Sequence, residues 1–591
     1  MKGIPETVTI VPRRENDMKS LLIVVILGLG LFAMGFRPWP AFNQDTSASA
    51  ENGKTLYLKY CTTCHGVDGT GEGTATVYLF PKPRDFTKGI FKFQSTPSGS
   101  LPTDGDLERT IRNGMPGSAM PAWDGLSAGE RKDLISYVKT FSERFRTNKP
   151  SDPLEIEKEP QSTPEMLRNG KAVFALAGCW MCHGKNGAGD GPSSKNMTDD
   201  LGRPTPPYNF TRAGAFKGGG TPQDIYRTFS TGIGGTPMPG YGEDALAVGR
   251  ESFGDLTNLE GYYTSNEVRE FKEFISQWPK EEHLSRMSLA ERKQLADDRR
   301  WSLVSYVLSL SKSGKTQISY TTTDHLLTSA TTDDVSKFGD PFSQRWNAVK
   351  GEELSLISLW QRDTPTDRVN VQSVTDGKSI AFRLEWEDST QDDQALHDAT
   401  FGDAAAIQFP LNPSSQPFFG MGDTNFAVNI WQWKSWWEAD SKKYAGVNSA
   451  FPRNATDFYL YDVSGGSRME YLVSKDSARM LSIPWNAGWS SGNLLSAQSR
   501  RSSVEDLNAK GFGTLRSQGP AGQNVGGNGV WKNGKWVAVF TRSLASQDLN
   551  DVPLTSRNTI PVAFAVWDGF LGDRNGQKMV TNWYTLNIGP K

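Results

Sequence analysis

Two short cysteine–histidine motifs carry the chemistry that is easiest to recognise in this chain of 591 residues. All four of its cysteines, and two of its five histidines, stand in the Cys-x-x-Cys-His segments 61–65 and 179–183. In this pattern two thiols can bond the vinyl groups of one porphyrin, and the adjacent histidine can ligate the iron. The pattern therefore predicts two covalent haem c groups with His65 and His183 as iron ligands. The cysteines that would hold them are Cys61, Cys64, Cys179 and Cys182.

Two other kinds of site also use Cys-x-x-Cys pairs. A single zinc ion held by both pairs is disfavoured, because such sites usually separate their pairs by about 15–20 residues, whereas these pairs are 118 residues apart. A redox dithiol has no need of a histidine after each pair. No further cysteine is present for a disulfide, an iron–sulfur cluster or a thiol nucleophile. Haem attachment is therefore the favoured interpretation.

An internal repeat supplies the candidates for the second axial ligand. The offset of 118 residues that relates the two motifs also relates many of the glycines that follow them. Met120 and Met238 each stand 55 residues after their motif histidine, and a proline follows each of them. Met115 is another candidate in the first unit, but Ile233 occupies the equivalent position in the second. The shared spacing favours Met120 and Met238. Ligation by histidine and methionine leaves no open position on the iron, which favours electron transfer.

The two repeat units resemble class I cytochrome c domains. Each begins and ends with a helical pattern around its haem motif, and we expect the two domains at 46–150 and 160–315. The second unit carries about 51 extra residues near 242–292, which are mostly polar and helical in pattern. A surface elaboration is favoured for this insertion over an element that docks a partner.

An uncharged apolar run of 16 residues, Leu21–Phe36, lies near the N-terminus and follows three basic residues. A membrane span needs about 20 apolar residues and the core of a signal peptide about 7–15, so the run falls between the two. The small-residue site Ala48–Ala50 comes late for signal cleavage. We therefore expect residues 1–45 to be an uncleaved membrane anchor, with the bulk of the chain on the periplasmic side. A cleaved signal peptide is the alternative.

Length and charge exclude several classes of protein. The formal net charge is −2, so the chain has no basic footprint for nucleic acid. Charged residues make up 22 % and hydrophobic residues 37 %, which is ordinary for a globular protein and unlike a disordered or multi-span membrane protein. At roughly 100–200 residues per domain, we expect about three or four units.

The region after about residue 320 has a different pattern. A Ser/Thr-rich linker at 311–334 leads into it, and 13 of the 18 tryptophans follow. Helical periodicity fades, apolar and polar residues alternate, and Asn533-Gly534 fits the turn of a hairpin. Strands are predicted at 379–386, 458–461, 530–532, 535–540, 562–567 and 579–588. Several short strands predict an all-β sandwich over 320–591. Exposed tryptophans on such a sandwich would suit a carbohydrate-binding module.

Two segments of this region, 404–437 and 562–588, resemble a known family. It is the haem b-binding gamma subunit of ethylbenzene dehydrogenase and related type II enzymes of the dimethyl sulfoxide reductase family. The group includes nitrite oxidoreductase and the selenate, chlorate and dimethyl sulfide enzymes. The resemblance implies one haem b in the sandwich, with a methionine and a lysine as iron ligands. The matching positions are Met421 and Lys578.

The chemistry of these two residues leaves alternatives open. Met421 follows an apolar Phe-Phe-Gly segment that could cover a porphyrin, but it could also be a core methionine. Lys578 could be a solvated turn lysine, and as a ligand it would have to be neutral. His325 and His397 are the rival ligands, whereas His283 is expected at the surface.

Residues and resemblance together predict a multidomain fold. Two all-α class I cytochrome c domains precede an all-β, haem b-binding sandwich, and one membrane anchor helix lies at the N-terminus. The function expected is that of a membrane-anchored electron-transfer subunit with no catalytic residue of its own. The resemblance implies iron–sulfur and molybdenum subunits of a periplasmic oxidoreductase as partners, as in nitrite oxidoreductase or nitrate reductase. Electrons would pass to or from a soluble cytochrome c, a membrane oxidase or a quinone enzyme.

Two alternative functions use the same residues differently. The first is a dihaem cytochrome c fused to a haem-free sandwich that binds carbohydrate or docks a partner. The second is a dihaem peroxidase, which needs one iron with an accessible or displaceable ligand. The matched methionine spacing argues against the peroxidase.

Overall fold

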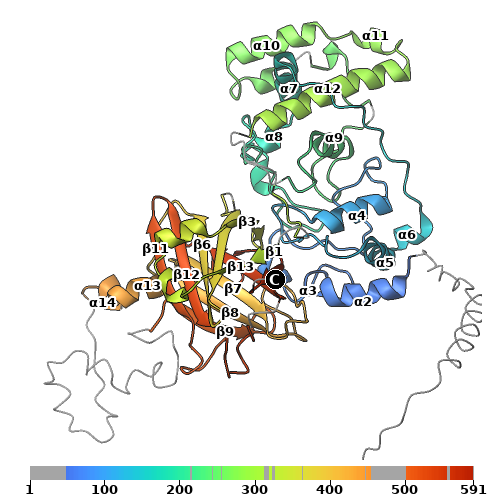
Figure 1. Ribbon diagram of the computed structural model, residues 1–591. Helices are drawn as coiled ribbons and strands as arrows, with labels where there is room; N and C mark the ends of the chain where they lie inside the picture. Colours follow the sequence, from blue (N-terminus) through green and yellow to red (C-terminus); the bar gives the residue numbers. More distant parts are fainter. Residues whose placement is uncertain are drawn as a thin grey trace, which may run out of the picture. The chain divides into compact units, whose positions relative to one another are not determined.

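The computed structural model describes most of the chain (Figure 1). The described residues are 48–212, 216–242, 244–253, 256–311, 318–322, 326–362, 364–445, 447–453, 501–554 and 559–589. The apolar run 21–36 and the strand predicted at 458–461 lie outside them. Within these residues no helix is both long enough and apolar enough to cross a membrane. Residues from Ser49 onward belong to one unit.

The first helical domain is built on the crossing of two helices. Its helices are α2 (Ala50–Tyr60), α3 (Thr62–His65), α4 (Asp104–Asn113), α5 (Ala128–Lys139) and α6 (Glu143–Thr147), with the 3-10 helix η1 (Thr76–Tyr78). Gly53 lets α2 approach α5, because a Cβ there would lie 1.9 Å from the backbone oxygen of Asp133. Tyr57 of α2 is buried, and its hydroxyl donates to the carbonyl of Gly66 at 2.7 Å. This bond fixes the end of the first haem motif against α2.

The second helical domain repeats this crossing. Its helices are α7 (Pro164–Leu176), α8 (Trp180–His183), α9 (Pro222–Thr231), α10 (Ser265–Ser276), α11 (Glu281–Leu284) and α12 (Leu289–Ser309), with 3-10 helices η2 (Ser194–Asn196), η3 (Arg250–Phe253) and η4 (Thr257–Leu259). Gly170 of α7 packs on α12, where a Cβ would lie 1.9 Å from the backbone oxygen of Ser302.

Gly170→Ala should therefore destabilise the second domain by about 2–3 kcal/mol, because overpacking a close helix contact costs about that much. The matched control is Gly129→Ala on α5, where an added Cβ meets nothing closer than 3.9 Å. We expect that variant to keep or slightly raise stability, since alanine favours helix over glycine. Thermal unfolding of the two variants checks this. Equal losses in both would contradict the packing argument.

The insertion near 242–292 covers the second domain with a helix that keeps most of its residues at the surface and adds one apolar face to the domain's core. Helix α10 buries Val268, Phe271 and Ile275 in the same cluster as residues of α7 and α12. Glu267, at its first turn, accepts hydrogen bonds from Lys171 and Lys185 at 2.7 Å each. An amphipathic helix hides its apolar face within a polar sequence, which is why composition alone pointed to the surface.

The C-terminal domain is a sandwich of two sheets (Figure 1). The nine-stranded sheet contains β1 (Leu326–Thr328), β4 (Ile357–Ser358), β7 (Ala404–Pro410), β8 (Val428–Lys434), β9 (Val504–Ala509), β10 (Arg516–Ser517), β13 (Thr559–Trp567), β14 (Met579–Val580) and β15 (Tyr584–Asn587). The six-stranded sheet contains β2 (Ala330–Thr331), β3 (Glu352–Ser355), β5 (Arg368–Thr375), β6 (Ser379–Glu387), β11 (Gly526–Lys532) and β12 (Lys535–Ser543). The remaining elements are α13 (Ser435–Lys442), α14 (Val447–Ala450), η5 (Val335–Phe338) and η6 (Gln344–Ala348). The fold thus comprises two helical domains and a β-rich domain.

The nine-stranded sheet is apolar on both faces. On β7, Ala405 and Ile407 belong to the core between the sheets, whereas Ala404 and Ala406 belong to a second cluster on the opposite face. That second cluster also contains Leu79 and other residues of the first helical domain. We call this face the outer face. A strand buried on both sides loses strict alternation, as β7 does.

Most of the strands predicted in the described residues are confirmed, and one strand prediction is wrong. β11 and β12 form the predicted hairpin, with Asn533 and Gly534 at φ 54° and 75°, as a primed turn requires. The single strand expected at 579–588 is divided into β14 and β15, because Thr581 turns its hydroxyl to accept from the backbone N–H of Phe564 at 2.9 Å.

The expected polar linker is also wrong in its described part. Ile318 and Tyr320 are buried in the cluster on the outer face. β1 pairs in parallel with β15, and β2 pairs in parallel with β5. The segment therefore belongs to the sandwich.

Candidate haem-binding sites

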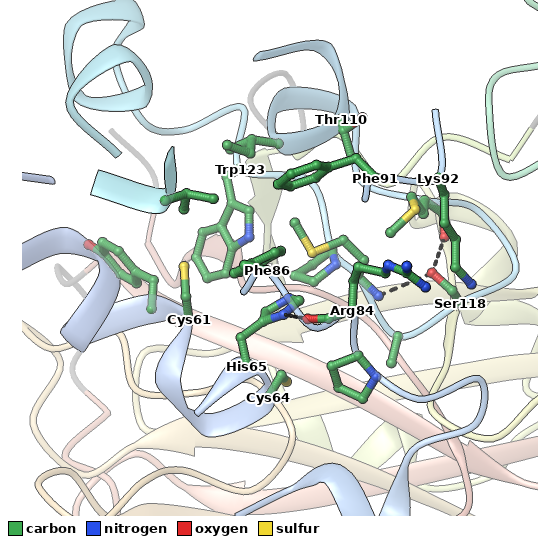
Figure 2. Close-up of a pocket in the computed structure, with 18 of the residues that line it drawn as sticks. Cys61, Cys64, His65, Arg84, Phe86, Phe91, Lys92, Thr110, Ser118 and Trp123 are labelled. Carbon is green, nitrogen blue, oxygen red and sulfur yellow. Dashed lines mark hydrogen bonds between the residues drawn. The ribbon is translucent and has the colours of Figure 1, made fainter. Parts of the chain in front are cut away.

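The first cavity gathers every residue predicted to hold the first haem c. Cys61, Cys64, His65 and Met120 all line it. Figure 2 shows the two cysteines and the histidine coming from one short segment, α3 and the residue that precedes it. Met120 comes from the loop between α4 and α5. The rest of the lining is mainly apolar and aromatic, including Phe86 and Trp123, as a porphyrin requires.

The imidazole of His65 is oriented for iron ligation. Its Nδ1 lies 3.1 Å from the backbone oxygen of Arg84 (Figure 2), and its ring stacks on Phe86 with centroids 4.3 Å apart. A proton on Nδ1 donated to that carbonyl leaves the lone pair on Nε2, which is the arrangement found for ligating histidines. Burial lowers the pKa of His65 to about 4, so the ring is neutral at physiological pH.

The second cavity reproduces this arrangement. It is lined by Cys179, Cys182, His183 and Met238. His183 Nδ1 lies 3.0 Å from the backbone oxygen of Tyr208, and its ring stacks on Phe210 at 4.3 Å. Burial lowers the pKa of His183 as well. The same donor set on the same scaffold fits a second haem c.

The two methionine loops share their hydrogen bonds. In the first loop the backbone N–H of Met115 donates to the oxygen of Met120 at 3.0 Å, and Ser118 Oγ caps the turn. In the second loop the N–H of Ile233 donates to the oxygen of Met238 at 3.2 Å. The hydroxyl of Thr236 donates to the carbonyl of Ile233 and accepts from the N–H of Met238, as that of Ser118 does in the first loop. The loop geometry thus repeats together with the spacing.

Met115 also lines the first cavity, so a substitution must separate it from Met120. Met120→Ala should abolish the sulfur-to-iron charge-transfer absorption of haem c1 and lower its potential, because thioether ligation raises the potential. Met115→Leu, which conserves volume, should leave both unchanged. Optical spectra and a redox titration of the full chain check this. Loss of the band in Met115→Leu alone would reverse the assignment.

The cysteine thiols are poor nucleophiles in this setting. Burial raises the pKa of Cys61, Cys64 and Cys179 to about 12. A redox dithiol needs a lowered thiol pKa, so burial argues against that function. The two cysteine pairs line different cavities, so they do not surround one zinc ion. Among the described residues, neither pair belongs to a group of three or more possible metal ligands.

The two haem c cavities share a wall. Lys92, Phe93 and Lys217 line both of them. Arg84, whose carbonyl orients His65, also pairs with Asp200 of the second domain at 2.8 and 2.7 Å. Burial, together with the nearby charges of Lys92 and Arg212, lowers the pKa of Lys217 to about 7. Two ammonium groups held near each other without an ion pair among the described residues fit the carboxylates that a haem carries.

Met421 lies at the outer face of the nine-stranded sheet in a strained backbone conformation. Its φ is 117°, a region that a bulky residue rarely adopts. The bend is fixed because Gly511 N–H donates to the oxygen of Met421 and Gly422 N–H to that of Phe418, both at 2.9 Å. The side chain is 6 % exposed. Such strain costs about 1–3 kcal/mol and tends to occur at functional sites.

Lys578 precedes β14, and it too is buried at this face. It is 5 % exposed, and its Nζ lies 4.9 Å from the ring centroid of Trp567, which packs in the same cluster as Met421. Burial lowers the pKa of Lys578 to about 7. It makes no ion pair within the described residues. A buried thioether and a readily neutralised amine on one apolar face fit a haem b iron.

The rival histidines do not share this environment. His397 is exposed and packs edge-on against Phe451, and His283 is exposed as expected. His325 lies outside the described residues.

The outer face and the first haem c cavity meet at two phenylalanines that the sequence related only to the porphyrin beside Met421. Phe418 and Phe419 line the first cavity and pack in the cluster that contains Met421. Phe419 is held in place because Gln408 Nε2 donates to its carbonyl at 2.8 Å. Their position two or three residues before Met421 was the available signal, but the cavity they reach is formed by a segment some 300 residues earlier.

Three family models match the chain. Residues 48–138 match the model described as cytochrome C oxidase, cbb3-type, subunit III, and residues 167–258 match the cytochrome c model. Residues 343–579 match the ethylbenzene dehydrogenase model.

Three curated proteins are similar over about two fifths of the chain. A heme subunit assigned to respiratory nitrate reductase in Haloferax mediterranei is 26 % identical over 255 residues, covering 42 % of this chain and 68 % of that protein. Dimethylsulfide dehydrogenase subunit gamma of Rhodovulum sulfidophilum is 27 % identical over 236 residues, covering 40 % and 66 %. Chlorate reductase subunit gamma of Ideonella dechloratans is 25 % identical over 255 residues, covering 42 % and 79 %.

Proposed function

We propose that the chain is the electron-transfer subunit of a molybdenum oxidoreductase complex, since its residues 343–579 match the ethylbenzene dehydrogenase model and follow two cytochrome c domains. The observation that carries the proposal is the composition of the two cavities. Each of them brings together the two cysteines, the histidine and the methionine of one repeat unit.

Three haem groups would be held by this chain's own residues. His65 and Met120 would ligate the iron of haem c1, His183 and Met238 that of haem c2, and Met421 and Lys578 that of haem b. When bound, each haem supplies an iron that changes oxidation state by one electron. The protein orients the ligands, excludes water with aromatic side chains and sets the charge around each porphyrin.

The three sites would form one sequence, with haem c1 in the middle. Phe418 and Phe419 separate the haem b face from the first cavity, and the wall of Lys92, Phe93 and Lys217 separates the first cavity from the second. The first cavity thus borders both the second cavity and the outer face that holds Met421.

The partners would stand at the two ends of this sequence. The relatives named as subunits of nitrate reductase, dimethylsulfide dehydrogenase and chlorate reductase support an iron–sulfur and a molybdenum subunit next to haem b. Haem c2 would exchange electrons with a soluble cytochrome c, a membrane oxidase or a quinone enzyme. A periplasmic location, anchored by residues 21–36, fits covalent haem attachment outside the cytoplasm. Nitrite oxidation or nitrate reduction is the partner chemistry we favour.

A haem assay of the purified full chain tests the proposal. Acid–acetone extraction followed by pyridine haemochrome spectra should find two covalent haems and one extractable haem per chain. The isolated chain should not turn over nitrate or nitrite, since we assign no molybdenum site to the residues that the structure describes. Two covalent haems with none extractable in freshly purified protein would favour the haem-free sandwich instead.

The carbohydrate-binding alternative lacks its expected surface. Within the described part of the sandwich no tryptophan is exposed. Trp386, Trp431, Trp433 and Trp536 lie in the core between the sheets, where they pack on one another. The high tryptophan content is therefore explained by packing.

A further inference from the structure

A group of carboxylates lies at one end of the sandwich, away from both haem c cavities. Asp388 directly follows β6, Asp403 directly precedes β7, and Asp568 directly follows β13. β7 and β13 are paired so that Ala404 lies opposite Trp567. The two sheets thus bring one carboxylate oxygen from each aspartate within 4.8 Å of the others.

These carboxylates are buried with no basic side chain paired to them in the described part of the chain. Asp388 is 3 % exposed, Asp403 is 0 % exposed and Asp568 is half-buried. In the described residues no lysine, arginine or histidine forms an ion pair with any of the three. Burying even one unpaired carboxylate costs several kcal/mol. Three together therefore require a bound positive charge or shared protons.

Hydrogen bonds account for only part of the oxygens. Asp403 accepts from the backbone N–H of Gly569 at 2.8 Å, from that of Asp392 at 2.7 Å and from Trp536 Nε1 at 2.8 Å. Asp388 Oδ1 accepts from the backbone of Thr390 at 3.1 Å, but its Oδ2 is buried with no partner.

A fourth carboxylate adds to this unmet demand. Asp392 Oδ2 is also buried without a hydrogen-bond partner. Asp392 lies beside Asp403, because its N–H donates to Asp403 Oδ2 at 2.7 Å and its carbonyl accepts from the N–H of Asp403 at 2.8 Å. Two buried oxygens without hydrogen-bond partners, in a cluster of like charges, are suited to bind a cation.

We propose that Asp388, Asp403 and Asp568, with Asp392 beside them, bind a calcium ion. The donors are all oxygen atoms, which suits calcium and disfavours zinc and copper. Calcium takes 6–8 oxygen ligands at about 2.3–2.6 Å, and carboxylate oxygens within 4.8 Å of one another can reach one such ion. Magnesium usually keeps several waters and is held by one or two carboxylates rather than by a group of protein oxygens, so it suits this group less well.

The ion would join two loops across the sandwich. One is the loop 388–403 between β6 and β7, and the other begins at Asp568 and ends at Lys578. Asp573 in that second loop pairs with Arg362 at 2.9 Å, and its N–H donates to the carbonyl of Asp568 at 3.1 Å. The calcium site itself requires no haem, but its loss would loosen the segment that presents Lys578.

The test uses the full holoprotein after removal of calcium with EGTA. Added Ca²⁺ should bind with a stoichiometry of about one per chain in a calorimetric titration and raise the melting temperature by several degrees, whereas equal Mg²⁺ should not. Asp388→Asn should lose both effects. Asp398→Asn, an exposed aspartate of the same loop, should keep both. The haem spectra serve as a separate readout, so a failed haem assignment does not affect this result.

Three outcomes would overturn the proposal. One is the absence of binding and of any melting shift in the wild-type chain, which decides the matter even if Asp388→Asn does not fold. The second is an equal response to Mg²⁺. The third is retention of both calcium effects by a folded Asp388→Asn chain.

Discussion

Replacing Lys578 with alanine is expected to remove haem b and leave both covalent haems in place. The amine contacts Trp567, which packs in the same cluster as Met421, and burial already brings its pKa to about 7. We expect extractable haem to fall from about one per chain to less than a tenth. Haemochrome spectra before and after extraction measure both fractions on one sample. Lys378→Ala, at an exposed lysine of the same domain, should retain all three haems.

Loss of haem b from this variant has to be distinguished from unfolding. Lys578→Leu keeps apolar volume at the site and removes the buried amine, whose desolvation disfavours the folded state. The haem-free sandwich of that variant should therefore melt no lower than the haem-free wild type. Met421→His should keep haem b but lower its potential, because imidazole replaces a thioether. Unchanged haem b in Lys578→Ala would show that another residue ligates the iron.

That the haem motif and the methionine of each unit would line one cavity could be predicted from the sequence, because their information is local and repeated. The cysteines and histidine share one short segment, and the methionine lies at the same distance in both units. The structure adds the physical reason for that distance, since the same turn of backbone and hydroxyl hydrogen bonds precedes Met120 and Met238.

The residues that join the sites could not be predicted in the same way. Lys92 and Lys217 come from different repeat units and are not equivalent positions, so no spacing relates them. Tyr320 was assigned to a polar linker, yet its hydroxyl accepts from the backbone N–H of Gly117 in the first methionine loop at 2.9 Å. Such contacts depend on how whole domains pack against one another. The pattern of residues within one segment does not predict that packing.

The sandwich shows the same division between local and distant information. The hairpin of β11 and β12 follows from its Asn-Gly turn and the alternation on either side. β1 and β2 have only three and two residues, and each exists because a distant strand pairs with it in parallel. The double burial of β7 was likewise hidden, because an apolar strand does not reveal what covers its second face.

Replacing Lys217 with glutamine is expected to lower the midpoint potentials of both haem c groups. Lys217 lines both cavities, donates to Gln361 Oε1 at 3.2 Å and has no ion pair among the described residues. Carboxylates of bound haem would favour its charged form, and loss of a nearby positive charge stabilises the ferric state. We expect shifts of tens of millivolts in a spectroelectrochemical titration of the full chain. Lys132→Gln, at an exposed lysine of the first domain, should cause almost none because solvent screens its charge.

The pattern of shifts distinguishes a shared wall from a general loosening of the fold. Loss of a cation common to both cavities lowers both potentials together, so electrons should remain distributed between haem c1 and haem c2 much as before. The proposed haem b site lies behind Phe418 and Phe419 and should keep its potential, so the driving force for transfer from haem b to haem c1 should fall. A shift confined to one haem c would mean that Lys217 serves a single cavity. A parallel shift in haem b would mean that the substitution acts on the fold rather than on the wall.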